Sequence, residues 1–180
     1  MMALAVVIAA AFFYGAERRR MVPGPAQRDT GQVYASYPVQ PGDRFAIGFR
    51  HSVNKYPLTD VFEISEDYHI YAQETYYYSY GAGVQTELNE GETFRIEEDG
   101  AMVVGNINNM VDGFRVNLNV ITDHTLMLGD IAPVYAQVKE HIGIFTDETE
   151  IQVGDVRVIS MNNLCGEKLG VVFTCEHRWL

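Results

Sequence analysis

The sequence predicts an all-β protein, an antiparallel β-sandwich or barrel preceded by an N-terminal hydrophobic segment. Clusters of turn-forming residues recur at short intervals from Pro41 to Asp130, and the segments between them alternate apolar with polar residues. The chain also holds 11 Tyr and 9 Phe, residue types that favour strands. Apolar residues do not recur at helical spacing over any long stretch, and the best short helix candidate is 131–138.

Alternation sets the phase of the strands in chain order. Phe45, Ile47 and Phe49 lie on one side of the first segment, and the next two segments, 58–64 and 68–76, alternate in the same way. Each of these three segments carries one ionisable residue in register with its apolar side: His51, Asp60 and Glu74. A buried charge needs a partner, so we expect these groups to pair or to line a cavity.

Two later segments are also typical strands. Residues 114–120 place Phe114, Val116 and Leu118 on one side. The dipeptide Asp99-Gly100 lies between two apolar segments and predicts a hairpin, because both residues tolerate the positive φ of a type I′ turn.

Composition shifts divide the chain into four parts. We expect a signal or membrane-anchor segment, a linker rich in proline, a β domain and a C-terminal extension with additional strands, over 1–20, 21–30, 31–138 and 139–180.

Residues 2–14 form an uninterrupted apolar run followed by Arg18-Arg19-Arg20. The run is shorter than the roughly 20 residues of a comfortable membrane span, which suits a signal-peptide core or a short anchor. An uncleaved anchor is favoured, because cleavage after Ala16 would place Tyr14 where a small residue is preferred. The arginines alone would hold the domain in the cytoplasm by the positive-inside rule, in conflict with the location that family resemblance implies below. A buried core segment is the remaining alternative.

Charge and cysteine content exclude several classes of function. The formal net charge is −11, and such a surface repels nucleic acid. Cys165 and Cys175 stand without the companion ligands of a zinc site. We expect no cofactor, and we expect a disulfide between these cysteines if the domain is exported.

The cluster of His51, Ser52 and Asp60 is not expected to form a catalytic triad. Neighbouring strand residues point to opposite faces, and no nucleophile elbow surrounds the serine. Either the ionisable residues form a structural network that fixes strand register, or they line a pocket for a small solute, with Tyr76 and Tyr78 as walls. Hydrolysis by the two carboxylates is a third, weaker alternative.

A set of short motifs resembles the bacterial and archaeal family called domain of unknown function 1850, over about 31–138. The matching residues, to which the resemblance assigns no roles, are His51, Ser52, Pro57, Asp60, Glu74, Gly81, Gly83 and His124. The resemblance implies a small exported or membrane-tethered protein without enzymatic activity. It also implies frequent encoding beside tripartite ATP-independent periplasmic (TRAP) transporters whose solute receptor is of the TAXI type. The chain departs from the family by continuing beyond Val138.

Together these arguments predict a non-catalytic accessory or interaction component of a TAXI-type TRAP transport system. We expect it to be tethered to the cell membrane, with its domain on the periplasmic or extracellular side, and to contact transporter subunits. The alternative is a module that binds a small solute. The predicted binding residues are His51, Ser52, Asp60, Glu74, Tyr76, Tyr78, Gly81, Gly83 and His124.

Overall fold

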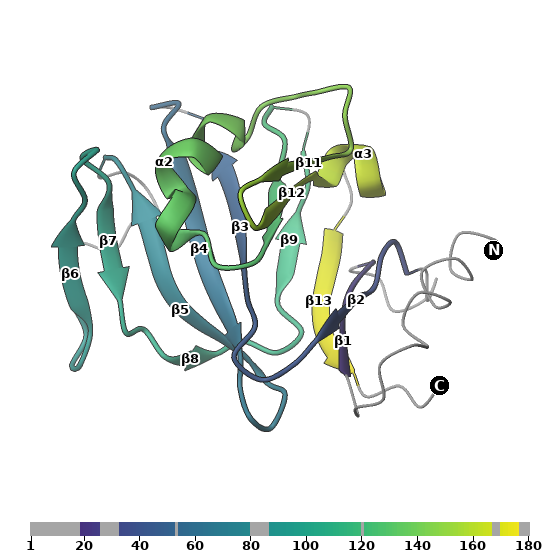
Figure 1. Ribbon diagram of the computed structural model, residues 1–180, viewed down its shortest axis with the longest axis horizontal. Coiled ribbons are helices and arrows are strands. Elements are labelled where there is room, and N and C mark those ends of the chain that lie inside the picture. The colour runs from purple at the N-terminus through teal and green to yellow at the C-terminus, as the bar shows by residue number, and fades with distance from the viewer. Residues whose placement is uncertain are drawn as a thin grey trace.

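A computed structural model describes residues 19–25, 33–52, 54–79, 87–119, 121–166 and 170–176 (Figure 1). Gly81, Gly83 and the apolar run 2–14 lie outside the described residues. None of the helices in the described ranges has the length and apolar character that crossing a membrane requires.

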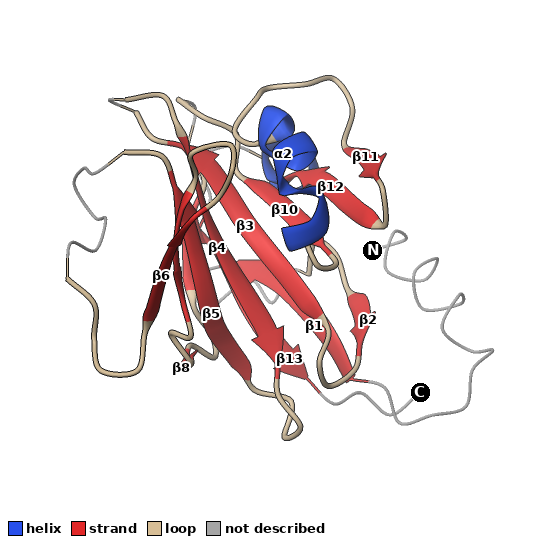
Figure 2. Ribbon diagram, turned by 60° about the vertical axis from the view of Figure 1, so that its left-hand side comes forward, coloured by secondary structure: helices blue, strands red, loops and turns tan. Residues whose placement is uncertain are grey.

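Most of the described secondary structure is strand (Figure 2). The strands are β1 (Arg19–Pro25), β2 (Tyr37–Val39), β3 (Arg44–Arg50), β4 (Pro57–Ile64), β5 (Ile70–Tyr77), β6 (Thr93–Ile96), β7 (Met102–Gly105), β8 (Asn109–Met110), β9 (Arg115–Asn117), β10 (Thr125–Leu128), β11 (Glu150–Val153), β12 (Val156–Ser160) and β13 (Gly170–Glu176). The helical elements are η2 (Ala132–Val134), α2 (Tyr135–Val138), η3 (Lys139–His141) and α3 (Met161–Cys165).

The strands form two open antiparallel sheets. The large sheet has the order β11-β12-β10-β3-β4-β5-β7-β6, with β8 paired to β5, and the small sheet has the order β2-β1-β13-β9. The predicted all-β antiparallel class is therefore confirmed, and of the two predicted architectures the open sheets form a sandwich rather than a closed barrel.

Four phenylalanine rings form the centre of the contact between the two sheets. Phe45 and Phe62 of the large sheet stack at 5.0 Å between ring centroids, and Phe114 stacks on Phe62 at 4.6 Å. Phe173 of β13 closes the group, at 5.0 Å from Phe114 and 6.2 Å from Phe45. Stacked rings bury large apolar surfaces, so this phenylalanine group joins the small sheet to the large one.

The opposite face of the large sheet is covered by the helical segment 131–142. Tyr135, Val138 and Ile142 pack here against strand residues such as Ala46 and Met127 (Figures 1 and 2). The central strands are thus buried on both faces, which explains why β3 and β10 contain runs of buried residues. The predicted helix at 131–138 is confirmed.

A close approach at Gly48 lets the helical segment reach the sheet. A Cβ atom at this position would lie 2.7 Å from Cγ2 of Ile142, closer than packed carbon atoms come to one another. Glycine is therefore the residue that allows Ile142 to pack on β3.

A β-bulge interrupts the pairing of β4 with β5. Phe62 pairs with Ala72, whereas the preceding residue of β4, Val61, pairs with Glu74, so that Gln73 is the extra residue. An extra residue reverses the alternation of the strand beyond it. Ala72, before the extra residue, therefore faces the small sheet, whereas Glu74, after it, faces the helical segment.

The chain outside the expected β domain takes part in the sandwich. Residues 21–25, expected as linker, belong to β1, which pairs with both β2 and β13. Its Gly and Pro residues suggested a linker, but backbone pairing on both sides makes it a strand. The extension 139–180 contributes β11, β12 and β13.

The expected disulfide is not formed. Both Cys165 and Cys175 are free thiols, and Cys165 is buried in α3, where burial raises its pKa to about 12. Cys165 lies in α3, which precedes β13, whereas Cys175 pairs with Met21 near the far end of β13. The sequence separation suggested a closed loop, but the extended strand between the two residues holds them apart.

The hairpin predicted at Asp99-Gly100 is confirmed, with a different turn. β6 and β7 pair antiparallel from Ile96 and Met102 onward, which leaves a longer connection than a two-residue loop. Gly100 has a φ of 85°, and Asp99 is not among the described residues with positive φ. The amide of Gly100 donates to the carbonyl of Glu97 at 2.9 Å.

We expect Phe173→Ala to lower the free energy of unfolding by about 3–5 kcal/mol, because Phe173 is fully buried and its loss opens a cavity in the phenylalanine group. Phe94→Ala, at a ring that is 43% exposed on β6, is the control and should cost less than about 1 kcal/mol. Urea denaturation followed by fluorescence measures both. Equal losses would show that β13 is not needed to hold the two sheets together.

Candidate functional site

Asp60 and Glu74, two of the three ionisable residues expected to share a pocket, lie on opposite faces of the large sheet. Asp60 pairs with Ile47, on the face that packs against the small sheet. Glu74 pairs with Val61, on the face beneath α2. The bulge at Gln73 is the physical reason. The prediction assumed unbroken alternation along 68–76, and the extra residue moves Glu74 to the other face. These residues therefore do not form the predicted pocket around His51, Asp60 and Glu74.

Glu74 belongs to a network of charges on the α2 side of the sheet. Its carboxylate lies 3.4 Å from Nη1 of Arg95 and 3.7 Å from Nη2 of Arg44, and it accepts a hydrogen bond from the hydroxyl of Tyr76 at 3.0 Å. Arg95 also donates to that hydroxyl at 3.1 Å. With two guanidinium groups and a phenol around it, this carboxylate has the contacts of a structural network.

Asp60 is half-buried on the face of the large sheet that packs against the small sheet, and it has one hydroxyl donor. Oγ1 of Thr75 donates to its carboxylate at 2.7 Å. Desolvation by burial raises the pKa of Asp60, and the hydrogen bond from Thr75 opposes that rise. Both residues project from adjacent central strands, so this pair also fixes the register of β4 and β5.

The remaining predicted residues are distributed over two environments. His51 and Ser52 begin the loop between β3 and β4, where the amide of His51 donates to the carbonyl of Tyr56 at 3.0 Å. Tyr76 is buried beneath Tyr135, with ring centroids 4.3 Å apart. Thus the histidine and serine of the family motif lie in a loop, and Tyr76 lies in the core.

Tyr78 joins three elements near the end of β5. Its hydroxyl donates to Asp99 at 2.5 Å, and its ring stacks on Tyr56 at 6.0 Å. Nζ of Lys139 reaches the same aspartate at 2.6 Å and lies 5.3 Å from the centroid of the Tyr78 ring. Tyr78 therefore connects the β6–β7 hairpin to the helical segment.

His124 is buried just before β10 and stacks on Phe49, with ring centroids 5.4 Å apart. Desolvation by burial lowers its pKa to about 4. Within the described residues, its Nδ1 has no hydrogen-bond partner. The side chain is thus held neutral in an apolar environment.

Loops from distant parts of the sequence meet at one end of the large sheet, which we call the Arg50 end and define as loops 51–56, 119–124 and 142–149. Arg50 connects them. Its guanidinium donates to the carbonyls of Ile142 at 2.9 Å and Lys55 at 3.1 Å, and its backbone amide donates to Oγ1 of Thr122 at 3.1 Å. Each loop is therefore anchored to the last residue of β3.

The Arg50 end exposes large hydrophobic side chains. Of the eight that are exposed among the described residues, four lie on these three loops, and we call them the apolar rim: Tyr56, Ile121, Ile144 and Phe145. Ile121 is 67% exposed. Apolar side chains grouped on anchored loops mark an interaction surface more often than single scattered ones do.

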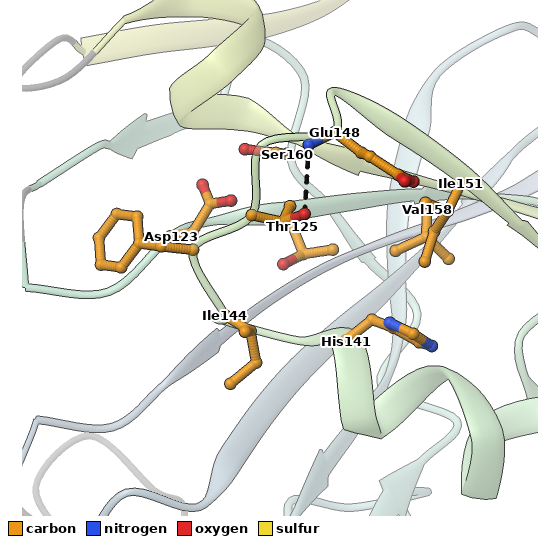
Figure 3. Close-up of a pocket in the computed structure, with 10 residues that line it drawn as sticks. Asp123, Thr125, His141, Ile144, Glu148, Ile151, Val158 and Ser160 are labelled. Carbon is orange, nitrogen blue, oxygen red and sulfur yellow. Dashed lines mark hydrogen bonds between the residues drawn. The ribbon is translucent and has the colours of Figure 1, made fainter.

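A cavity of about 220 Å³ opens beside this rim, between the segment 141–148 and the ends of β10, β11 and β12 (Figure 3). Its polar lining consists of Asp123, Thr125, His141, Thr146, Glu148 and Ser160. Its apolar lining consists of Ile144, Phe145, Ile151 and Val158. We call it the Asp123 cavity.

The Asp123 cavity contains an aspartate, a serine and a histidine, but their arrangement differs from that of a hydrolase triad. Figure 3 shows the imidazole of His141 pointing away from Ser160 and Asp123. The hydroxyl of Ser160 accepts from the amide of Asn163 at 3.2 Å, capping α3, and it also bonds with Asp123. A triad needs the imidazole between the serine and the carboxylate. In the described residues, groups of three or more potential metal ligands are also absent.

Sequence reasoning missed Arg50, the apolar rim and the cavity. Local signals were present, since the four residues Ile144-Phe145-Thr146-Asp147 follow Gly143 directly and place two large apolar residues at a turn. Loops 119–124 and 142–149 lie together because of the order of the strands in the sheet, and the alternation of apolar and polar residues does not predict that order.

The described residues form a β-sandwich with three loops anchored at the Arg50 end. A sequence model described as Domain of unknown function (DUF1850) matches residues 45–132. This match confirms the resemblance to the family over these residues. No curated protein and no solved structure matches the chain.

We expect Gly143→Ala to destabilise the protein by about 2–4 kcal/mol, because its φ is 70° and an added Cβ would lie 2.5 Å from the backbone nitrogen of Arg50. Gly42→Ala is the matched control, since its φ is 85° and nothing lies within 4 Å of its Cβ position. It should cost about 1 kcal/mol. Equal losses in chemical denaturation would rule out close packing of loop 142–149 on β3.

We expect His124 to make stability depend on pH between 6.5 and about 4. The unfolded imidazole takes up a proton near pH 6.5 and the folded one only near 4, so protons favour the unfolded state in this window. Relative to His124→Gln, the native protein should lose up to roughly 3 kcal/mol as pH falls. The raised pKa values of Asp60 and Asp123 act in the opposite direction, and the comparison cancels them. Parallel stability curves for the two proteins would contradict this assignment.

Proposed function

We propose that the protein is a non-catalytic interaction component of a TAXI-type TRAP transport system and that the Arg50 end is its contact surface. The observation that carries this proposal is the apolar rim, four exposed hydrophobic side chains on three anchored loops. The match of residues 45–132 to the DUF1850 family model supports the link to transport through the resemblance described above.

The anchoring of the loops favours a binding role. Arg50 holds all three of them through hydrogen bonds to backbone or side-chain oxygens, and Gly143 packs against its backbone. Loops that are ordered before binding lose little conformational entropy on contact, so more of the apolar burial contributes to affinity. An apolar centre formed by such loops is what a protein interface requires.

The direction of β1 places the start of the described chain at the end of the sandwich opposite this surface. Gly170, at the start of β13, pairs with Asn117, which precedes loop 119–124 of the Arg50 end. Arg20 of β1 pairs with Glu176 at the opposite end of β13 (Figure 1). The chain therefore enters the sandwich at the end away from the apolar rim. In a membrane-tethered protein, this arrangement directs the rim into the aqueous compartment toward a partner.

We expect the tagged full-length protein, co-expressed with the receptor and membrane subunits of a TAXI-type transporter from the same genome, to retain at least one of these subunits on purification. A Tyr56→Ser, Ile121→Ser double variant should lower recovery about tenfold, because it removes exposed rim contacts without touching the Asp123 cavity. Quantitative mass spectrometry of the purified fractions gives the ratio.

The matched control is a Leu88→Ser, Met110→Ser double variant, which removes two exposed hydrophobic side chains elsewhere on the surface. It should recover as much of the subunit as the native protein does. The proposal fails if the native protein retains no transporter subunit, and the assignment of the surface fails if both double variants lose recovery equally.

A further inference from the structure

The Asp123 cavity has a lining whose two halves differ in chemistry. Its floor carries the carboxylate of Asp123, which is 1% exposed, and the hydroxyls of Thr125 and Ser160. Its apolar lining includes Ile144 and Phe145. Ligand sites combine apolar walls with a few convergent polar groups in this way.

The charges around the cavity favour a cation. Asp123 and Glu148 are both lining residues, whereas lysine and arginine are absent from the described lining. His141 also lines the cavity, but its imidazole points away from Asp123 (Figure 3). The net charge of −11 adds a negative field over the whole surface. An anionic ligand would therefore be repelled from this cavity.

Asp123 retains capacity for one further donor. An ionised carboxylate offers about four acceptor sites, and the donors that reach it are the amide of Asn162 at 3.0 Å, the hydroxyl of Ser160 and the amide of His124. Burial raises the pKa of this aspartate, which reflects the cost of a carboxylate removed from water. A bound cation would offset that cost by a charge-assisted hydrogen bond.

The size of the cavity limits the ligand. A volume of about 220 Å³ corresponds to roughly seven water molecules at ~30 Å³ each. A short alkyl chain with one terminal polar group fits this space, with its chain against Phe145 and Ile144. Larger aromatic ligands do not.

We propose that the Asp123 cavity binds a small primary alkylammonium group, with the ammonium at Asp123 and the alkyl chain against Ile144 and Phe145. This site does not rest on the proposed transport function. The group can belong to a free amine or to a lysine side chain of a partner, which share this chemistry.

The test uses the full-length protein and three probes of matched size: n-butylammonium, n-butanol and butyrate. Butylammonium should bind saturably in calorimetry and shift the amide resonances of residues 123–125 and 141–148, whereas butanol should bind about tenfold more weakly because it lacks the charge. Butyrate should not bind. Equal binding of butanol, or no saturable binding of butylammonium at millimolar concentration, overturns the proposal.

Two exposed residues allow substitution without disturbing the fold. Glu148→Gln should weaken butylammonium binding, because it removes one of the two negative charges of the lining. Asp147→Asn is the control, because Asp147 is exposed next to it but does not line the cavity. Phe145→Ala should weaken it similarly, with Phe94→Ala as the control. Asp123→Asn should abolish binding if the folded state is preserved. If Glu148→Gln and Phe145→Ala bind as the native protein does, the ligand does not occupy this cavity.

A comparison with N-acetyl-lysine methylamide separates the two sources of the group. Tighter binding of butylammonium indicates a site for a free amine, because the peptide groups do not fit the cavity. Equal binding indicates a site for a partner's lysine side chain. Loss of transporter recovery in the rim variants leaves both results unchanged, since Tyr56 and Ile121 do not line the cavity.

Discussion

Burial of the central strands on both faces is the constraint on which the rest of the structure depends. Each of β3 and β10 carries one set of side chains toward the phenylalanine group and another toward the helical segment. A sheet buried on two sides needs two covers. The small sheet, in which β1, β2 and β13 come from the two ends of the chain, forms one, and the internal segment 131–142 forms the other. The cover on the α2 side continues directly into loop 142–149, so core packing positions the Arg50 end.

Much of the fold could be predicted from local pattern. Alternation placed Phe45 and Ile47 on one side of their strand, which is the side that faces the small sheet, and the dipeptide Asp99-Gly100 marked the β6–β7 hairpin. These predictions hold because each depends only on residues within one strand or one turn. The linker assigned to 21–30 was wrong over 21–25, because the pairing that makes β1 a strand comes from β13 at the other end of the sequence.

The candidate site was harder to predict because it depends on phase and on strand order. One extra residue, Gln73, moved Glu74 to the face opposite Asp60, and no composition signal marks that bulge. His124 was identified through the resemblance, yet its stacking on Phe49 comes from the pairing of β10 with β3. Arg50 looked like an ordinary polar residue of an alternating strand. Its role arises from carbonyls of Lys55 and Ile142 that only the tertiary fold brings to it.

The place of β13 has a consequence for how the molecule is made. This strand lies between β1 and β9 in the small sheet, and its residue Cys175 pairs with Met21 near the start of the described chain. β1 therefore cannot pair with its neighbour β13 until β13, the last of the described strands, has been synthesised. Pairings between residues so far apart in sequence form slowly, since the loop must close before contacts stabilise it. A chain of this topology lacks its small sheet until β13 has been synthesised, and until then the phenylalanine side of the large sheet has no cover.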